Sequence, residues 1–449
     1  MDNDDYTAKM VELIELMRAI GNDTQQCEVK ECARRISTTI TDTLSAFSNG
    51  SGGYIILGLS EKNGFTPVEG FNARSMQESL SQACEKLTPV VRPVVVTCPF
   101  EGTNLVFAVV DEMLPREKPC YYTEAGPYNG SYIRTGDGDR HLTAYEVDRL
   151  LEEQHQPEND IAIVDGAIAE DLNPKLTEAL LASERRKHPR AFEGREDIDM
   201  LLDLRVLRAK PPTDSAGRTA RRKGKSANAL AGLCPTLAGL LAFGNYPQKF
   251  FPRLNVTAAM FPGISRDEVF ASGKRLIHCE TFVGTIPAMV EDAVDAVMRW
   301  TRGGAAHDGA ASSSITASAP YSAAILRETV ANALVHRDYS ADSLGTPVHV
   351  DVFTDRIEIT NPGGLFGAVT SRTLKRPIST STRNPFLFSL LRATTLAGSA
   401  TLSDDGTGYE QIEAILRNEH RPPVRIDNSI GSFRITIPTA GRVVTGPSS

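Results

Sequence analysis

A glutamate and an asparagine four residues apart begin the stretch of sequence that is richest in chemistry. Glu328 and Asn332 lie in AAILRETVANALVHRDY, a pattern that predicts a helix, so both side chains project from one helix face. An amide carbonyl is a hard oxygen ligand of the kind that Mg²⁺ accepts, and a carboxylate can orient or deprotonate a water molecule. The pair therefore suits a magnesium–nucleotide site.

Two glycine-containing segments follow this helix where phosphate groups could be bound. Asn361-Pro362-Gly363-Gly364 comes directly after a predicted strand, and Gly406-Thr407-Gly408 precedes a predicted helix. Glycine lets the backbone approach a phosphate closely, and a helix N-terminus adds a positive dipole. Each motif alone is weak, because such pairs are usually solvated and such glycines usually form turns. Their order and joint spacing support the prediction.

The same region resembles the RecG-like C-terminal ATP-binding family, a branch of the GHKL ATPases. The matching strings are ETVANALVHRDYS, VDVFTDRIEITNPGGL, STRNPFLFSLL and DGTGYEQI, and PTLAGLLAFGNYPQKFFP is similar to the segment that usually precedes this domain. The resemblance implies a GHKL (Bergerat-type) α/β sandwich with a largely antiparallel sheet. It also implies ATP and Mg²⁺ as cofactors.

Roles for individual residues follow from that resemblance. It makes Glu328 the candidate ATPase base and Asn332 the Mg²⁺ ligand. It places Asn361, Gly363 and Gly364 in the adenine-side loop, and Gly406 and Gly408 in the phosphate-side loop. The typical GHKL adenine loop begins with Asp, whereas Asn361 stands here. Its carbonyl can still accept from an adenine amino group, but hydrolysis of ATP stays open.

The chain lacks the motifs of two other classes of nucleotide-dependent protein. His336-Arg337-Asp338 is followed by no Asn at the spacing of a protein kinase, and neither a kinase glycine-rich loop nor a matching lysine strand precedes it. We therefore expect a structural His336 at the helix end. The chain contains no G-x-x-x-x-G-K-[ST] sequence, so strand separation by a helicase motor is not predicted.

A second set of motifs lies near the N-terminus: EVKE (28–31), LSAFSN (44–49), GGYIILGL (52–59) with Glu61, KPCYY (118–122) and GSYIRTGD (130–137). Together these motifs resemble the Schlafen-type AlbA domain. The likeness covers residues 10–155 and implies an α+β domain that engages nucleic acid.

Schlafen nucleases use three carboxylates, and the matching positions here are Asp23, Glu28 and Glu61. By resemblance, this cluster would hold a divalent cation that activates water against a phosphodiester. Asp stands at position 23 where the family has Glu, and Glu stands at position 61 where the family has Asp. These exchanges keep the negative charge but change the length of the side chain. Binding without cleavage therefore stays open.

Basic and aromatic residues of this domain are candidates for contacts with nucleic acid. The candidates for phosphate contacts are Lys30, Lys118, Arg134 and Arg140. Tyr121, Tyr122 and Tyr132 would either stack on exposed bases or pack on the sheet.

Positioning these groups requires two α+β regions and the segment between them. In residues 1–155, patterns predict helices over 8–20, 34–47 and 144–154, and strands over 54–60, 90–100, 104–112 and 131–136. Residues 156–320 read as a mixed, mainly helical segment with helices over 170–186 and 196–208. Flexible loops are expected at 209–228, where basic residues form either a solvated loop or a phosphate-contacting arm, and at 301–320. The ATP-binding domain is expected over 321–449.

Composition excludes several classes of protein. Of 449 residues, 41% are hydrophobic and 23% are charged, which argues against wholesale disorder. No apolar run approaches the roughly 20 residues of a membrane span. The acidic N-terminus differs from a signal peptide, and seven cysteines without a CxxC pair support neither a disulfide framework nor a Cys-rich zinc site. We therefore expect a cytoplasmic protein without a membrane partner.

The net charge of −8 makes the chain a poor general binder of polyanions. The excess lies in residues 1–155, which carry 14 basic and 24 acidic side chains. Without a bound cation or a basic groove, this region should bind nucleic acid poorly.

Together these features predict an ATP-binding, DNA- or RNA-binding regulator of the transcriptional type, in which Mg-ATP in the C-terminal domain modulates the N-terminal domain. The alternative is a metal-dependent Schlafen-like endoribonuclease that acts on structured RNA such as tRNA, in defence or stress. A third reading is an ATP-sensing scaffold without a nucleic-acid partner. Weak ATP hydrolysis and a homo-oligomer stay open, since GHKL and Schlafen-type modules often associate.

Overall fold

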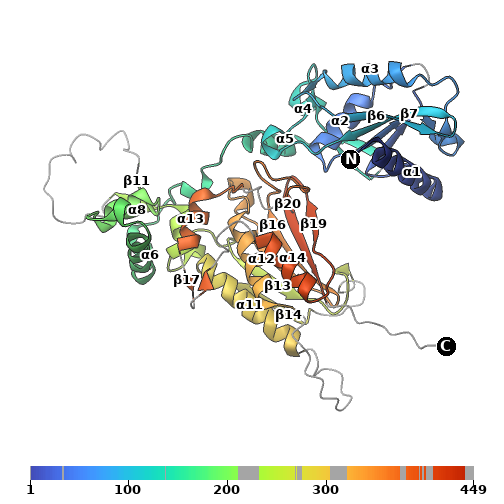
Figure 1. Cartoon of the computed structure of the whole chain (residues 1–449). Helices are drawn as coiled ribbons and strands as arrows, with labels where there is room; N and C mark the ends of the chain where they lie inside the picture. The colour runs from blue at the N-terminus through green and yellow to red at the C-terminus, as the bar shows by residue number, and fades with distance from the viewer. Residues whose placement is uncertain are drawn as a thin grey trace, which may run out of the picture. The chain divides into compact units, whose positions relative to one another are not determined.

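The computed structural model describes residues 2–32, 35–136, 138–210, 232–267, 269, 276–303, 321–374, 381–393, 395–396, 399–400 and 408–439. The chain is an α+β protein of two compact units (Figure 1). Unit 1 comprises Met1–Gln156 with Leu365–Thr373, and unit 2 comprises Pro157–Gly364 with Leu374–Ser449. Most of the expected loops at 209–228 and 301–320 lies outside the described residues, as does Gly406. Among the described helices, none has both the length and the apolar character needed to cross a bilayer.

Unit 1 is built on a four-stranded sheet in the order β1-β2-β7-β6. These strands are β1 (Cys27–Lys30), β2 (Gly53–Leu57), β7 (Thr103–Val110) and β6 (Val94–Phe100). Strand β1 runs parallel to β2, and the other two pairings are antiparallel. The predicted strands at 54–60, 90–100 and 104–112 are confirmed over most of their length.

Helices cover both faces of this sheet, because successive side chains of a strand point to opposite sides. Helix α1 (Asn3–Ile20) packs on the face that carries Ile56, and α2 (Ile40–Asn49) and α3 (Ala73–Cys84) pack on the face of Ile55 (Figure 1). Helix α1 confirms the pattern at 8–20. Helix α2 begins at Ile40, later than its pattern predicts, and the hydroxyls of Ser37 and Thr39 bond to each other in the turn ahead of it.

A hairpin and a capped helix complete the part of unit 1 that concerns the site. The hairpin pairs β9 (Tyr132–Thr135) with β10 (Gly138–His141). Helix α5 (Ala144–Glu152) starts with a capping box between Thr143 and Glu146, which confirms the predicted helix. The remaining short elements are β3 (Leu59–Ser60), β4 (Thr66–Pro67), β5 (Leu87–Thr88), β8 (Tyr121–Tyr122) and α4 (Gly126–Gly130).

Unit 2 contains a six-stranded sheet in the order β14-β13-β15-β16-β20-β19. These strands are β14 (His278–Phe282), β13 (Val256–Met260), β15 (Val348–Val352), β16 (Arg356–Pro362), β20 (Ser432–Pro438) and β19 (Arg425–Asn428). Strands β13 and β15 are parallel and the other neighbours antiparallel, so the expected largely antiparallel sheet is confirmed.

One face of this sheet packs on three helices, α11 (Ile286–Gly303), α12 (Ala323–Val335) and α14 (Gly408–Asn418) (Figure 1). Apolar residues of β13, β15, β16 and β20 alternate toward them and form one core. The same core includes residues of α6 (Pro174–Lys187), α8 (Asp197–Asp203), α9 (Leu237–Phe243) and α13 (Pro385–Ala393). Residues of the expected middle region therefore share the core of unit 2.

A helix is predicted over residues 196–208, but the observed helix α8 (Asp197–Asp203) is shorter. Helix α8 ends at Asp203, and Arg205 adopts a left-handed φ of 58°, so the chain turns there into β11 (Leu207–Ala209). The other short elements of unit 2 are α7 (Pro189–Phe192), β12 (Leu233–Pro235), β17 (Thr395–Leu396) and β18 (Ser399–Ala400).

Candidate functional site

Glu328 and Asn332 form a hydrogen-bonded pair on α12. The side-chain nitrogen Nδ2 of Asn332 donates to Oε1 of Glu328 at 3.1 Å. With its nitrogen directed to the carboxylate, the amide offers Oδ1 on its other side. This oxygen is the ligand atom that Mg²⁺ would take, so the pair fits the expected site.

The backbone of Gly408 lies directly against this pair. A Cβ atom at position 408 would collide with Oε1 of Glu328 and would lie 3.2 Å from Nδ2 of Asn332. Gly408 is the first residue of α14, so the N-terminus of that helix, with its positive dipole, lies beside the pair. The structure thus brings a phosphate-side glycine to the predicted metal ligand.

Asn361 is the second-to-last residue of strand β16, directly before the glycines of the adenine-side loop, and its side chain is buried. Its Nδ2 donates to the carbonyl oxygens of Pro362 at 3.0 Å and Gly363 at 3.4 Å. Both donor hydrogens of the amide are thereby directed to the chain itself, and Oδ1 is the acceptor that remains. This orientation fits an adenine amino group, so Asn can take the place of the usual Asp.

The loop after Asn361 is held by main-chain hydrogen bonds from two other segments. The N–H of Gly363 donates to the carbonyl of Gly431 at 3.0 Å, and the N–H of Asp338 donates to the carbonyl of Pro362 at 2.9 Å. Gly363 has a φ of 84°, and a Cβ there would collide with the guanidinium of Arg383. A Cβ atom at position 364 would likewise collide with the carbonyl oxygen of Ser429. Only glycine fits at these two positions.

His336 and Arg337 have structural surroundings. Burial, together with the charge of Arg383, lowers the pKa of His336 to about 4, so its imidazole is neutral at neutral pH. The guanidinium of Arg337 is buried and donates to the carbonyls of Ser343 and Thr346, each at 2.7 Å. These contacts agree with a structural role for the helix end.

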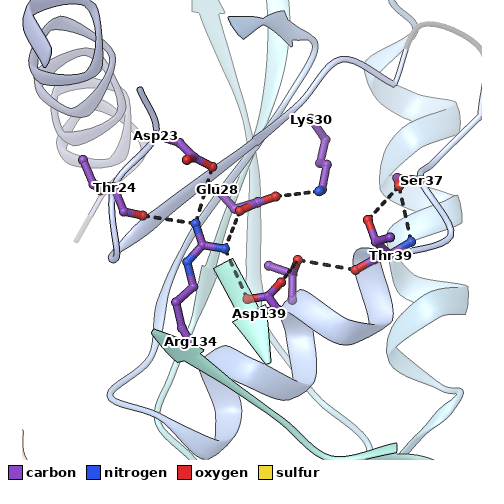
Figure 2. A network of polar contacts seen from close by, with 9 residues as sticks. Asp23, Thr24, Glu28, Lys30, Ser37, Thr39, Arg134 and Asp139 are labelled. Atoms are coloured by element: carbon purple, nitrogen blue, oxygen red, sulfur yellow. Dashed lines mark hydrogen bonds and ion pairs between the residues drawn. The ribbon is translucent and has the colours of Figure 1, made fainter. Parts of the chain in front are cut away.

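In unit 1, Arg134 on β9 collects the acidic residues that the sequence suggested as metal ligands. Figure 2 shows its guanidinium donating to Oε2 of Glu28 at 2.5 Å and to Oδ2 of Asp23 at 3.4 Å. It also donates to Oδ1 of Asp139 at 3.2 Å and to the carbonyl of Thr24 at 3.2 Å. The side chain of Arg134 is only 4% exposed. We call these five residues the Arg134 network.

Lys30 and Thr43 extend the Arg134 network. The ammonium of Lys30 lies 2.5 Å from Oε1 of Glu28, and the hydroxyl of Thr43 donates to Oδ2 of Asp139 at 2.7 Å. Burial and the neighbouring carboxylate of Glu28 raise the pKa of Asp23 to about 7. Near neutral pH, the carboxyl group of Asp23 is therefore only partly ionised. The carboxylate of Glu28 is paired with the guanidinium of Arg134.

The Arg134 network does not fit a divalent cation. A guanidinium occupies the position between Asp23 and Glu28, and the side chain of Glu61, in the 3₁₀ turn Glu61–Asn63, is exposed. Throughout the part of the chain that the structure describes, no three or more His, Cys, Asp or Glu residues gather as metal ligands would. The described residues of this domain therefore do not fit a metal-dependent step.

The other proposed nucleic-acid residues lie in different surroundings. Lys118 is buried 3.2 Å from Oε1 of Glu112, and burial lowers the pKa of Lys118. We therefore no longer assign Lys118 a phosphate contact. Arg140 is exposed on β10 and donates to the hydroxyl of Thr135. The ring of Tyr132 lies against that of His141, with 4.3 Å between ring centroids and a tilt of 33° between the planes. Tyr121 and Tyr122 are half-buried on β8.

Sequence reasoning missed several residues of these sites. Asp139 stands beside the quoted GSYIRTGD motif, and Arg383 and Asn384 stand inside the quoted STRNP motif. Glu112 ends the segment whose apolar pattern predicts a strand over 104–112, and it lies two residues beyond the end of β7 at Val110. Arg383, Asn384 and Glu112 are charged or amide residues next to strongly apolar segments. This position was the sequence signal that could have indicated them.

Two parts of the chain match known protein families. Residues 345–437 match the family described as ATP-dependent DNA helicase recG C-terminal, and residues 23–143 match the family described as Schlafen, AlbA_2. No curated protein matches the chain.

Two solved structures are similar to the chain, one over most of its length and one over less than a third. The DIP2311 protein from Corynebacterium diphtheriae is 18% identical with a TM-score of 0.40, over 96% of this chain and 69% of that one. The N-terminal domain of a helicase RecG-related protein from Nitrosomonas europaea is 25% identical with a TM-score of 0.24, over 29% of this chain and 92% of that one.

The two family matches cover one candidate site in full and the other in part, because Glu328 and Asn332 lie ahead of residues 345–437. The Schlafen match contains the whole Arg134 network, and the RecG match contains the adenine-side loop and Gly408. This pairing indicates a nucleotide-binding protein with a function related to nucleic acid. The chain therefore carries a Schlafen AlbA_2 domain in its N-terminal part and an ATPase-type domain of the RecG C-terminal family in its C-terminal part.

Proposed function

We propose that unit 2 binds ATP with Mg²⁺ between α12, the adenine-side loop and the start of α14. The observation that supports this most is the position of Gly408, whose backbone lies against Glu328 and Asn332 from a distant part of the chain. A glycine at a helix N-terminus, beside a carboxylate and an amide oxygen, combines the groups that a magnesium–phosphate complex requires.

Each residue has a distinct part in this proposal. Oδ1 of Asn332 coordinates Mg²⁺, and the hydrogen bond from Asn332 to Glu328 fixes the direction of both side chains. The carboxylate of Glu328 orients water near the phosphates and is the base if hydrolysis occurs. Oδ1 of Asn361 accepts from the adenine amino group. The bound Mg²⁺ would supply charge neutralisation at the phosphates.

Isothermal titration with ATP, with and without Mg²⁺, tests this site. Asn332→Ala should weaken Mg-ATP binding at least about tenfold, which is about 1.4 kcal/mol, and remove its dependence on Mg²⁺. Asn418→Ala is the matched control, because Asn418 is an exposed amide at the end of α14. Absence of ATP binding by the wild type, or equal binding by wild type and Asn332→Ala, would overturn the proposal.

We further propose that Mg-ATP modulates nucleic-acid binding by unit 1, as a regulator would require. The support is the course of the chain, because Gly364 of unit 2 is followed directly by Leu365–Thr373, which belongs to unit 1. Within unit 1, the N–H of Ser371 donates to Oε2 of Glu112 at 3.1 Å, and the N–H of Arg116 donates to the carbonyl of Gly367 at 3.3 Å. If a bound nucleotide shifts the adenine-side loop, the segment Leu365–Thr373 would also have to move, because it follows that loop directly in the chain.

The basic residues that the sequence suggested for phosphate contacts are only partly available for such binding in the described part of unit 1. Arg134 is buried in its network and Lys118 in its ion pair, whereas Arg140 is exposed. We therefore expect salt-sensitive binding of modest affinity. Titration of fluorescent single- and double-stranded DNA and RNA at two salt concentrations, with and without Mg-ATP, measures both the affinity and its modulation. Identical affinity with and without Mg-ATP would exclude modulation.

The geometry favours binding over metal-dependent cleavage of RNA. Two of the three candidate carboxylates, Asp23 and Glu28, hold Arg134. Incubation of structured RNA with the protein and Mg²⁺ or Mn²⁺ should therefore leave the RNA intact. Cleavage by the wild type that is lost in Glu28→Gln would reverse this preference and establish the endoribonuclease.

A further inference from the structure

Arg383 is a buried cation beneath the adenine-side loop, and neither the family matches nor the roles above give it a function. Its side chain is among the largest fully buried ones of the described residues, with 1% of its surface exposed. It precedes α13 in the STRNP motif. A buried guanidinium is costly unless its surroundings hold it closely, so its contacts indicate what it does.

The guanidinium of Arg383 supports the two glycines of the loop. Its Nη2 donates to the carbonyl of Gly364 at 3.1 Å. Its Nη1 lies where a Cβ of residue 363 would be, so the guanidinium takes the space that a side chain at Gly363 would fill. The loop that presents Asn361 therefore rests on a flat cationic group.

Asp338 places a negative charge on the same side of the loop. Burial would raise the pKa of Asp338, but hydrogen bonds from Ser340 and Ser343 and the charge of Arg383 hold it below its ordinary value. The N–H of Asp338 donates to the carbonyl of Pro362. Asp338 and Arg383 thus hold the carbonyls of Pro362 and Gly364, the residues on either side of Gly363.

The next residue, Asn384, connects this support to the helix that carries the magnesium pair. Its Nδ2 donates to the carbonyls of Val335 at 2.7 Å and Arg337 at 2.9 Å. These carbonyls lie at the C-terminal end of α12, where a helix has no partners of its own for its last carbonyl groups. The Arg383-Asn384 dipeptide therefore ties the adenine-side loop to the end of α12.

Helix α13 gives the dipeptide a fixed base. Oδ2 of Asp160, buried near the start of unit 2, accepts from the N–H groups of Phe386 at 2.9 Å and Leu387 at 3.1 Å. A carboxylate at this position caps the helix N-terminus. Arg383 is thus attached to an anchored helix, and its guanidinium has little freedom to move away from the loop.

We propose that Arg383 is a positioning residue that sets the adenine-side loop and thereby the preference of the site for adenine over guanine. This proposal rests on the proposed function of unit 2. Arg383 acts through the backbone of Gly363 and Gly364, which determines where Oδ1 of Asn361 points. Adenine presents an amino group where guanine presents a carbonyl, so a correctly held acceptor attracts the first and repels the second.

The test compares ATP and GTP binding, each with Mg²⁺, by the full chain and by Arg383→Lys. Lysine keeps the charge but lacks the planar group that lies on Gly363. We expect Arg383→Lys to bind ATP about tenfold more weakly while GTP binding stays unchanged, so the ratio of the two affinities falls about tenfold. Its dependence on Mg²⁺ should persist, because the pair on α12 is intact.

Two controls separate positioning from a general loss of structure. Arg417→Lys makes the same change at an exposed site of α14 and should keep both affinities. Asn332→Ala should weaken ATP and GTP alike and keep their ratio. If Arg383→Lys does not fold, Arg383→Gln provides a second variant with a planar donor. Failure of both variants to fold would overturn the proposal in favour of a purely structural arginine.

The outcomes distinguish the two proposals. A wild type that binds neither nucleotide would refute nucleotide binding itself, and the role of Arg383 with it. A wild type that prefers ATP, together with an Arg383→Lys variant that keeps the same ratio, would refute only the positioning role. A fall of the ratio in Arg383→Lys with intact Mg²⁺ dependence would confirm it.

Discussion

Arg134 donates a 2.5 Å hydrogen bond to Glu28 across 106 residues of sequence. Sequence patterns had assigned these two residues opposite tasks, one as a phosphate contact and the other as a metal ligand. In the folded domain each side chain neutralises the charge of the other. Both side chains are nearly buried, and a buried charge requires a partner of opposite charge. This ion pair explains how an acidic domain can enclose several carboxylates.

Removal of the charge of Glu28 should destabilise unit 1. Asp139 and Asp23 would still pair with Arg134, so we expect Glu28→Gln to cost about 2 kcal/mol, less than the loss of a fully isolated buried partner. Urea unfolding followed by circular dichroism measures the loss. Trp300, the single tryptophan, lies in α11 of unit 2, so its fluorescence transition should not move.

A control for this prediction is Glu101→Gln, which removes a carboxylate from an exposed ion pair with Arg18. Solvent screens such pairs, so the unfolding midpoint should stay the same. An unchanged midpoint for Glu28→Gln as well would mean that the Arg134 network contributes nothing to stability.

The stability of unit 1 should depend on pH through Asp23. Its pKa is about 7 in the folded chain against an ordinary value of 3.8, so between these pH values the folded state holds a proton that the unfolded state has lost. The contribution of this group to stability therefore falls as pH rises from about 4 to about 7. Asp23→Asn cannot titrate, and its stability relative to the wild type should increase over this range.

Unfolding at pH 5 and pH 8 checks the sign for Asp23. We expect the difference between Asp23→Asn and wild type to be more favourable to the variant at pH 8. A difference that is constant, or that favours the variant more at pH 5, would contradict the raised pKa.

Gly408→Ala should disturb the magnesium pair without unfolding unit 2. The new methyl group would collide with Oε1 of Glu328, the end of a flexible side chain that can rotate away. We expect Mg-ATP affinity to fall about tenfold and stability to change by less than about 1 kcal/mol. Calorimetric titration and thermal unfolding measure the two effects. Gly345→Ala, in open space, is the control that should leave both unchanged.

Ser371→Pro should uncouple the nucleotide from nucleic-acid binding. Proline lacks the N–H that donates to Glu112, so the segment Leu365–Thr373 loses one anchor in unit 1. We expect Mg-ATP affinity to stay near the wild-type value while the effect of Mg-ATP on nucleic-acid affinity decreases. Ser371→Ala keeps the N–H and should behave as wild type. Equal modulation in both variants would show that this anchor transmits nothing.

Much of the local structure was predictable because its causes lie close together in the chain. Apolar spacing predicted α1, α5 and the central strands of unit 1, and the four-residue spacing of Glu328 and Asn332 correctly placed both on one face of α12. Element ends were less predictable. Helix α8 stops where Arg205 turns left-handed, which its apolar pattern does not reveal.

The sequence by itself determined the two family resemblances, the α+β class and the helix face that carries the candidate magnesium pair. Tertiary structure alone decided which charges neutralise each other, because ion pairs such as Arg134 with Glu28 and Lys118 with Glu112 depend on how strands and loops meet in the fold. It also brought Gly408 to Glu328 and Arg383 beneath Gly363. Such contacts depend on burial and close packing between distant segments, and the spacing of residue types along the chain contains no information about them.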